Sequence, residues 1–203
     1  MRIESVSTQP DMVGRYKTVL SDGTVLRLYK QTVQDFGLYP GMELEQEALD
    51  RLLESASRMS AKMRAVRMVS ASSISKKELE QRLIQKGEDA SHAKQAVSWL
   101  SEMQLLDDGQ TARQIVERCI GKGYGVARAR QALYEKRIPK ELWEQALADY
   151  PDMSEEIRRY ICTHLPQEPD QKSLKKVIDA LLRRGHSYGN IRRVLDLEEL
   201  WEE

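Results

Sequence analysis

The chain of 203 residues is long enough for one or two ordinary domains, and its 32 basic and 32 acidic side chains leave a formal net charge of zero. Hydrophobic residues make up 40% of it and aromatic residues only 6%, so we expect several small cores filled by aliphatic side chains and Met. The absence of any run of about 18 apolar residues excludes a membrane-spanning helix. The N-terminus also lacks the basic and then apolar pattern of a signal peptide, so secretion is not expected. Two cysteines, Cys119 and Cys162, give no metal or disulfide framework, and we expect a cytoplasmic protein whose thiols are reduced.

The N-terminal part of the chain favours β-structure. Residues 15–20 and 24–29 have the composition of strands, and Ser21-Asp22-Gly23 between them favours a tight hairpin turn because Gly accepts a positive φ at little cost. An isolated hairpin is only marginally stable, so residues 2–7 are predicted to add a third strand. We therefore predict that residues 1–59 form a small β-rich domain followed by a linking helix.

The remainder of the chain repeats a helical unit about every fifty residues. Three positions align between the copies. They are Leu79, Leu83 and Gly87 in the first copy, Ala129, Leu133 and Arg137 in the second, and Val177, Leu181 and Gly185 in the third. Each repeat contains a pair of predicted helices. Before each pair, apolar residues follow the i, i+3, i+4, i+7 spacing, which predicts a further amphipathic helix there. We predict three-helix units at residues 60–106, 107–151 and 152–203. The expected fold is mainly α-helical, with tandem three-helix repeats in an extended curved array, which typically binds a long partner.

Capping residues mark several helix termini. Ser75, with Glu78 three residues later, forms a potential capping box, and Asp89 and Asp108 are predicted N-caps. Asp107 is adjacent to Asp108, and neighbouring side chains on a helix diverge by about 100°. We therefore expect a cap plus a neighbouring contact at this pair, and not paired acid–base chemistry.

The zero net charge hides an uneven distribution along the chain. Residues 61–140 hold 16 basic and 9 acidic side chains, a balance of +7. Residues 1–60 hold 7 and 9, a balance of −2, and residues 141–203 hold 9 and 14, a balance of −5. The basic middle segment is a candidate for an anionic partner, most obviously nucleic acid. The alternative is that these charges only solvate the outer faces of helices.

The segment Leu106-Asp107-Asp108-Gly109-Gln110-Thr111-Ala112 resembles the Leu-Asp-Asp-x-x-Phe-Ala motif of the RecX family of recombination regulators. The glycine-rich break at residues 121–125 and the helix after it resemble Gly-x-x-Arg-Ile-x-x-Glu-Leu-x-x-Lys-Gly-Ile, and residues 75–87 resemble the family's first unit. Two positions depart from the pattern: Thr111 stands where an aromatic residue is usual, and Arg137 where Gly is usual. The resemblance covers nearly the whole chain, the N-terminal hairpin included.

The resemblance implies a non-enzymatic regulator that binds filaments of the RecA recombinase on single-stranded DNA. Members of the family dampen the filament's ATP hydrolysis, its strand exchange and the repressor self-cleavage that it stimulates. On this basis we expect a role in DNA repair and the SOS response, with RecA filaments as the partner and single-stranded DNA as a candidate second partner. We expect a monomer, no catalytic residues, no cofactor and no metal.

Basic side chains of the middle segment are the candidate contacts to the filament. They are Lys76, Lys77, Arg82, Lys86, Arg113, Arg118, Lys122, Arg128, Arg130, Lys136 and Arg137. A three-unit array in the groove of the filament would contact successive protomers, and phosphate contacts would make binding sensitive to salt.

Two other classes of function are alternatives to a RecA regulator. A generic helical DNA-binding module that contacts no recombinase explains the basic segment equally well, although no helix has the Asn, Gln and Arg content of a recognition helix. An enzyme is disfavoured because no convergent set of nucleophile, base or metal ligands is present. The glycine-rich residues 121–125 lack the Gly-x-x-x-x-Gly-Lys-Ser/Thr spacing of a phosphate-binding loop and are expected to form a turn between helices.

Overall fold

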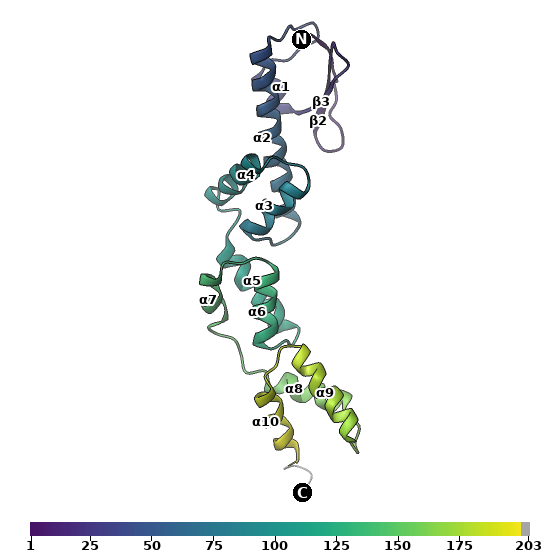
Figure 1. Ribbon diagram of the computed structural model, residues 1–203, viewed down its shortest axis with the longest axis vertical. Helices are drawn as coiled ribbons and strands as arrows, with labels where there is room; N and C mark the ends of the chain where they lie inside the picture. The colour runs from purple at the N-terminus through teal and green to yellow at the C-terminus, as the bar shows by residue number, and fades with distance from the viewer. Residues whose placement is uncertain (200–203) are drawn as a thin grey trace. The chain divides into compact units, whose positions relative to one another are not determined.

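The computed structural model describes residues 1–199 of the chain, which are mainly α-helical with a small antiparallel sheet at the N-terminus (Figure 1). The prediction of a helical fold behind a small β-rich region is thereby confirmed. Within the described residues, no helix combines the length and apolar character needed to cross a membrane.

The chain divides into two compact bodies. The N-terminal body comprises Met1–Ser72 and Leu79–Leu106, and the C-terminal body comprises Ser73–Glu78 and the chain from Asp107 onward. The unit boundaries inferred from the repeat, after residues 59, 106 and 151, remain predictions.

In the N-terminal body, three strands form a sheet with the order β1-β2-β3, both pairs antiparallel. The strands are β1 (Ile3–Val6), β2 (Arg15–Leu20) and β3 (Val25–Tyr29). The predicted hairpin joins β2 to β3, with Gly23 at φ +84° and the Asp22 carboxylate accepting a hydrogen bond of 2.9 Å from the Thr24 amide. The predicted third strand is β1, which covers the other edge of β2.

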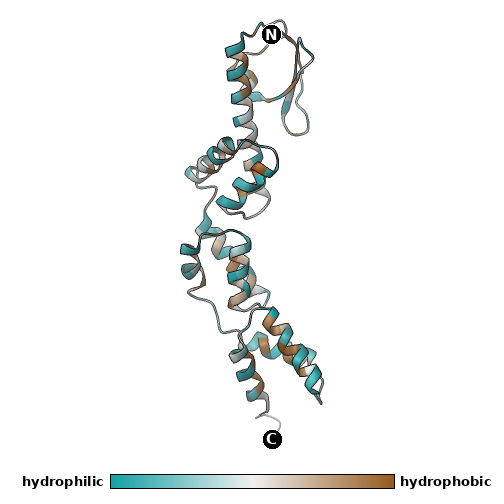
Figure 2. Ribbon diagram, viewed as in Figure 1, coloured by the Kyte–Doolittle hydropathy of each residue, from teal (hydrophilic) through white to brown (hydrophobic). Residues whose placement is uncertain are grey.

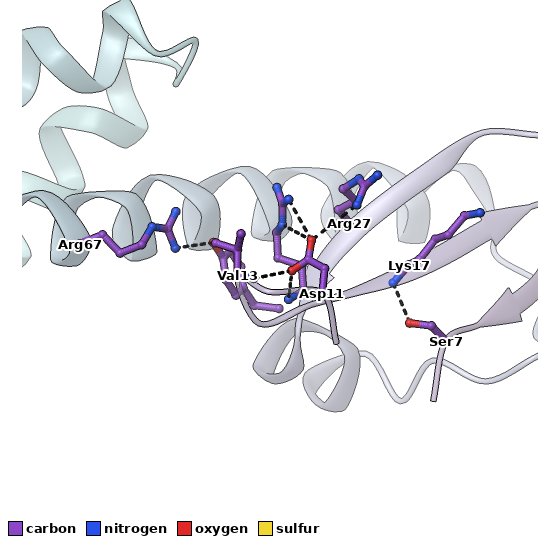
Figure 3. Close-up of polar contacts among 8 residues, drawn as sticks. Ser7, Asp11, Val13, Lys17, Arg27 and Arg67 are labelled. Atoms are coloured by element: carbon purple, nitrogen blue, oxygen red, sulfur yellow. Dashed lines mark hydrogen bonds and ion pairs between the residues drawn. The ribbon is translucent and has the colours of Figure 1, made fainter. Parts of the chain in front are cut away.

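The loop between β1 and β2 is held by one carboxylate, that of Asp11 (Figure 3). It accepts hydrogen bonds from the amides of Val13 (3.0 Å) and Arg15 (2.9 Å), and it forms ion pairs with the guanidinium groups of Arg15 and Arg27. The backbone hydrogen bond from Arg15, with further hydrogen bonds to the same group, lowers the pKa of Asp11 to about 2. The carboxylate is therefore ionised at neutral pH, where it can accept these hydrogen bonds.

Four helices complete the N-terminal body. They are α1 (Lys30–Asp35), α2 (Gln46–Ala71), α3 (Lys76–Gln85) and α4 (Ala90–Glu102), with the first turn of α3 belonging to the C-terminal body. The 26-residue α2 serves two cores: Leu52 packs with the sheet, and Ala61 and Ala65 lie fully buried farther along the helix, whose neighbour is α4. The buried Glu88 accepts hydrogen bonds from Ser60 (3.0 Å) and Arg64 (2.6 Å), as a buried charge requires.

The C-terminal body contains two further sets of helices. The first is α5 (Asp108–Gly121), α6 (Val126–Glu135), a 3₁₀ turn (Lys140–Leu142) and α7 (Trp143–Leu147); the second is α8 (Ser154–His164), α9 (Gln171–Arg183) and α10 (Tyr188–Glu199). Each set has its own apolar cluster, because apolar and hydrophilic residues alternate along the helices so that one face is buried (Figure 2). The repeat positions Leu133 and Leu181 are fully buried in these two clusters.

The three aligned helix ends share one backbone geometry. Gly87 (φ +88°), Arg137 (φ +55°) and Gly185 (φ +87°) each follow the helix in the left-handed conformation. In each case the amide of this residue and the amide of the following residue donate to carbonyls in the last turn of the helix. At the end of α6, Arg137 donates to the Tyr134 carbonyl (2.9 Å) and Ile138 donates to the Leu133 carbonyl (3.0 Å). This pair of bonds satisfies carbonyl groups that the helix end would otherwise leave open.

The predicted cap at Asp108 is wrong, and the neighbouring Asp107 caps α5 instead. The Asp107 carboxylate accepts hydrogen bonds from the amides of Gly109 (2.7 Å) and Gln110 (3.2 Å). Asp108 is buried and accepts a hydrogen bond of 2.8 Å from the Lys76 amide at the start of α3. The pair thus supplies a cap and a neighbouring contact, with the two roles exchanged relative to the expectation.

The two sets of helices in the C-terminal body, which correspond to the predicted second and third units, meet through their backbones. The Gly125 amide donates to the Arg184 carbonyl at 2.9 Å, and a Cβ on Gly185 would lie 2.3 Å from the Arg128 nitrogen. The Arg184 guanidinium lies over the rings of both Tyr124 and Tyr160, at 5.2 Å from each centroid. This joint has no room for a side chain at position 125 or 185.

Candidate partner-binding surface

The eleven basic residues singled out from the sequence are divided between the two bodies. Arg82 and Lys86 belong to the N-terminal body, and the other nine belong to the C-terminal body. Those nine lie on the first turn of α3 (Lys76, Lys77), on α5 (Arg113, Arg118), in the break after α5 (Lys122), on α6 (Arg128, Arg130) and just after α6 (Lys136, Arg137).

Three of these nine cations are already committed to carboxylates within the protein. Arg128 pairs with Glu135 at 3.1 Å, Arg130 with Glu144 at 3.0 Å, and Lys136 with Glu78 at 3.2 Å. Two of the three, Arg128 and Lys136, are only half-exposed. These residues have a structural role in addition to any contact with a partner.

The other six cations of the C-terminal body are exposed, and none forms an ion pair with a described residue. They are Lys76, Lys77, Arg113, Arg118, Lys122 and Arg137. Cations without an internal counter-ion keep their full charge available for an anionic partner. They form the candidate surface, which we call the open-cation set.

A polar network fixes the first turn of α3 against the end of α6. Ser75 donates to the Lys136 carbonyl (2.6 Å) and accepts from the Glu78 amide (3.1 Å), as predicted for the start of a capping box. Asp108 accepts from the Lys76 amide, and the ammonium group of Lys136 pairs with Glu78. Because Ser75, Glu78 and Asp108 are buried, this network holds Lys77 in a defined place.

Beside this network lies a groove of about 560 Å³, which we call the Tyr134 groove. Its lining comes from the first turn of α3, the end of α6 and the segment that leads into α7: Lys77, Tyr134, Glu135, Arg137, Ile138, Pro139, Lys140, Glu141 and Trp143. The Tyr134 side chain is 64% exposed, whereas the indole of Trp143 is half-buried and donates to the Ile138 carbonyl at 3.0 Å.

Among the groove residues suited to contact an anionic partner, sequence reasoning named Lys77 and Arg137 and missed Tyr134 and Lys140. Tyr134 follows the buried Leu133, and a turn of about 100° per residue takes its ring out of the core. Lys140 lies at the end of the basic segment, three residues after Arg137. Both residues could have been found from the sequence because they lie close to Arg137, the position that aligns with the helix-end glycines of the other two units.

Two titratable groups of this region, Glu135 and Cys119, have shifted pKa values. Hydrogen bonds from Gln131 and then from Arg128 lower the pKa of Glu135, which therefore stays ionised. Burial raises the pKa of the Cys119 thiol, which therefore stays protonated. Among residues 1–199, no group of three or more His, Cys, Asp or Glu is placed to hold a metal ion.

Comparison with known proteins gives the family of the chain. The family model described as RecX, second three-helix domain, matches residues 107–147. A regulatory protein RecX from Vibrio parahaemolyticus is 30% identical over 147 residues, which cover 71% of this chain and 95% of that protein. The chain belongs to the RecX family. A regulatory protein RecX from Clostridioides difficile is 25% identical over 201 residues and is similar to 96% of this chain.

Two solved structures agree on the fold. A crystal structure of regulatory protein RecX superposes with a TM-score of 0.67 at 20% identity, over 96% of this chain and 98% of that one. A crystal structure of RecX from Lactobacillus salivarius superposes with a TM-score of 0.63 at 19% identity, over 72% of this chain and 99% of that one. The arrangement of helices described above is therefore one that RecX proteins adopt.

Proposed function

We propose that this RecX protein binds RecA filaments on single-stranded DNA and restrains their ATP hydrolysis, strand exchange and stimulation of repressor cleavage. It acts as a monomer in the cytoplasm, through the basic residues of its middle segment. The observation that carries the proposal is the open-cation set, six exposed cations on the C-terminal body of a RecX chain, none of which pairs with a described carboxylate. Cations of this kind fit the phosphates and carboxylates that line a nucleoprotein filament.

The mechanism follows from charge and repetition. Each contact to the filament is weak, and several contacts made by one chain add through effective concentration. A protein held on successive protomers hinders the changes that accompany ATP turnover, provided that it binds one filament state more tightly than another. Arg82 and Lys86 of the N-terminal body are proposed as additional contacts.

The first test is single-stranded-DNA-dependent ATP hydrolysis by the RecA of the same organism, measured while this protein is titrated. We expect inhibition at well below one copy per RecA protomer. The variant Arg113→Glu/Arg118→Glu/Lys122→Glu should need at least about tenfold more protein for half-inhibition, since each lost charge contact weakens binding and the reversed charges repel.

A matched variant controls for the change in total charge. Lys30→Glu/Arg51→Glu/Lys94→Glu reverses three exposed cations of the N-terminal body that are not in the proposed set, and it should inhibit like the wild type. Circular dichroism checks that both variants keep their helix content. If the wild type binds bare DNA and leaves RecA unaffected, the protein is a generic DNA-binding module and the proposal is wrong.

A further inference from the structure

Tyr134 has a position that core packing does not explain. The residue is 64% exposed, and it is not among the residues that pack against the apolar cluster of the second helical unit. The ring lies in the same groove as Trp143, whose indole is fixed by its hydrogen bond to the Ile138 carbonyl. The groove therefore offers one accessible aromatic face beside an aromatic side chain of fixed orientation.

The charges around the ring favour an anionic ligand. Three cations line the groove, Lys77, Arg137 and Lys140, and none of them forms an ion pair with a described residue. Of the two carboxylates in the lining, Glu135 is engaged by Arg128 at 3.1 Å and by Gln131 at 3.2 Å. An aromatic face flanked by free cations is the combination with which proteins bind single-stranded nucleic acid, because bases stack on the ring and phosphates meet the cations.

Two of the cations are held in place before any ligand arrives. The network of Ser75, Asp108 and Lys136 fixes the turn that carries Lys77. The left-handed backbone of Arg137, locked by the two hydrogen bonds of the helix end, sets the direction in which that side chain leaves the chain. Little freedom of the backbone is lost on binding, which favours affinity.

We propose that the Tyr134 groove binds an unpaired nucleobase of single-stranded DNA, with the base stacked on Tyr134 and the flanking phosphates on Lys77, Arg137 and Lys140. This inference rests on the proposed function, since it names the element of the filament that this groove contacts. It also gives the protein a means of discriminating between single strands and duplex, because a paired base reaches the ring only after it leaves the stack.

The test uses the full chain and two fluorescent oligonucleotides of equal length: one of thymidines, and one in which abasic sites replace the bases and the phosphates are kept. Fluorescence anisotropy gives the two dissociation constants. Tyr134→Ala should weaken binding to the thymidine strand by about 5- to 100-fold, the range for loss of one stacked base. Tyr134→Phe keeps the ring and should bind like the wild type. Tyr188→Ala removes a ring of similar exposure, 55%, from α10 and should change nothing.

The abasic strand separates stacking from other effects. The wild type should bind it more weakly than the thymidine strand, and Tyr134→Ala should bind it as the wild type does. An equal loss on both strands overturns the proposal, because the ring then acts on folding or on phosphate contacts.

The inference and the proposed function fail in distinguishable ways. If Tyr134→Ala binds both strands normally and yet no longer inhibits RecA, the groove binds a protein segment; the nucleobase proposal is then wrong and the proposed function stands. If the wild type binds the thymidine strand through Tyr134 and does not inhibit RecA, the proposed function fails and the nucleobase site stands.

Discussion

Arg137 in the second helical unit and Gly185 in the third occupy the same place just after a helix, with the same left-handed backbone. Their surroundings differ. Gly185 lies against the backbone of the second unit, where a Cβ would be 2.3 Å from the Arg128 nitrogen, whereas Arg137 is exposed and lines the Tyr134 groove. The helix end dictates the φ angle, and the tertiary neighbours decide whether a side chain can be present.

Arg137 has a side chain although its backbone has the positive φ angle that favours glycine. A residue with a Cβ in the left-handed region costs roughly 1–2 kcal/mol relative to the right-handed one. Such a cost is commonly found where the side chain has a task. The Arg137 side chain adds a cation to the Tyr134 groove, and a glycine at this position would leave the groove without that cation.

The largest effect is expected from Gly185→Ala, which should lower the free energy of unfolding by about 3 kcal/mol or more, because strain in φ and steric overlap add. The overlap involves the Arg128 backbone, which is part of a helix and cannot move aside easily. Urea unfolding followed by circular dichroism measures the change.

Two further variants separate these causes. Gly87→Ala has the same φ and open space around it, so it should lose only about 1 kcal/mol. Gly125→Ala has an ordinary φ of −82° but would meet the Gly185 carbonyl at 2.1 Å, and its loss measures the overlap alone. Equal losses in all three would show that the joint between the units is not close-packed.

The sequence was sufficient for the mainly helical fold and for the hairpin because these depend on local patterns. Apolar spacing placed Leu133 and Leu181 in cores, and the Asp22-Gly23 turn predicted the joining of β2 to β3. The error at Asp108 has a different origin. Its partner is the Lys76 amide, 32 residues away in the chain, and no local pattern reports such a contact.

The candidate surface was less predictable for the same reason. Whether a basic residue is open or committed depends on carboxylates brought near by folding, such as Glu78, which is 58 residues from Lys136. Charge counts therefore placed the basic segment without separating the open-cation set from Arg128, Arg130 and Lys136. The role of Tyr134 depends on the groove, which only the fold creates.

A smaller effect, of opposite sign, is expected from Arg137→Gly. Relief of the left-handed strain should stabilise the protein by about 0.5–1 kcal/mol, after allowance for the greater freedom of Gly in the unfolded chain. Loss of one phosphate contact should also lower the slope of log affinity against log salt by about 0.7 for single-stranded DNA. Arg113→Gly, at an exposed helical position of α5, is the matched control and should destabilise the protein by about 1 kcal/mol. Destabilisation by both variants would show that the left-handed backbone of Arg137 carries no strain for a glycine to relieve.

The smallest effect on stability is expected at His186, the residue that follows Gly185, because only one imidazole titrates. The corresponding residue of the second unit is Ile138, which has no titratable group. Burial lowers the pKa of His186; the nearby Arg184 adds to this, while the hydrogen bond to the Gly123 carbonyl and the charge of Glu156 oppose it. The unfolded chain therefore takes up the proton first, at a pKa of about 6.5. The stabilisation is complete above that pH and is lost as the pH falls through the lower pKa of the folded state. The urea midpoint should accordingly drop between pH 7.5 and pH 5 in the wild type and drop less in His186→Gln, which keeps a donor for the Gly123 carbonyl. An equal drop in both would assign the pH dependence to other groups.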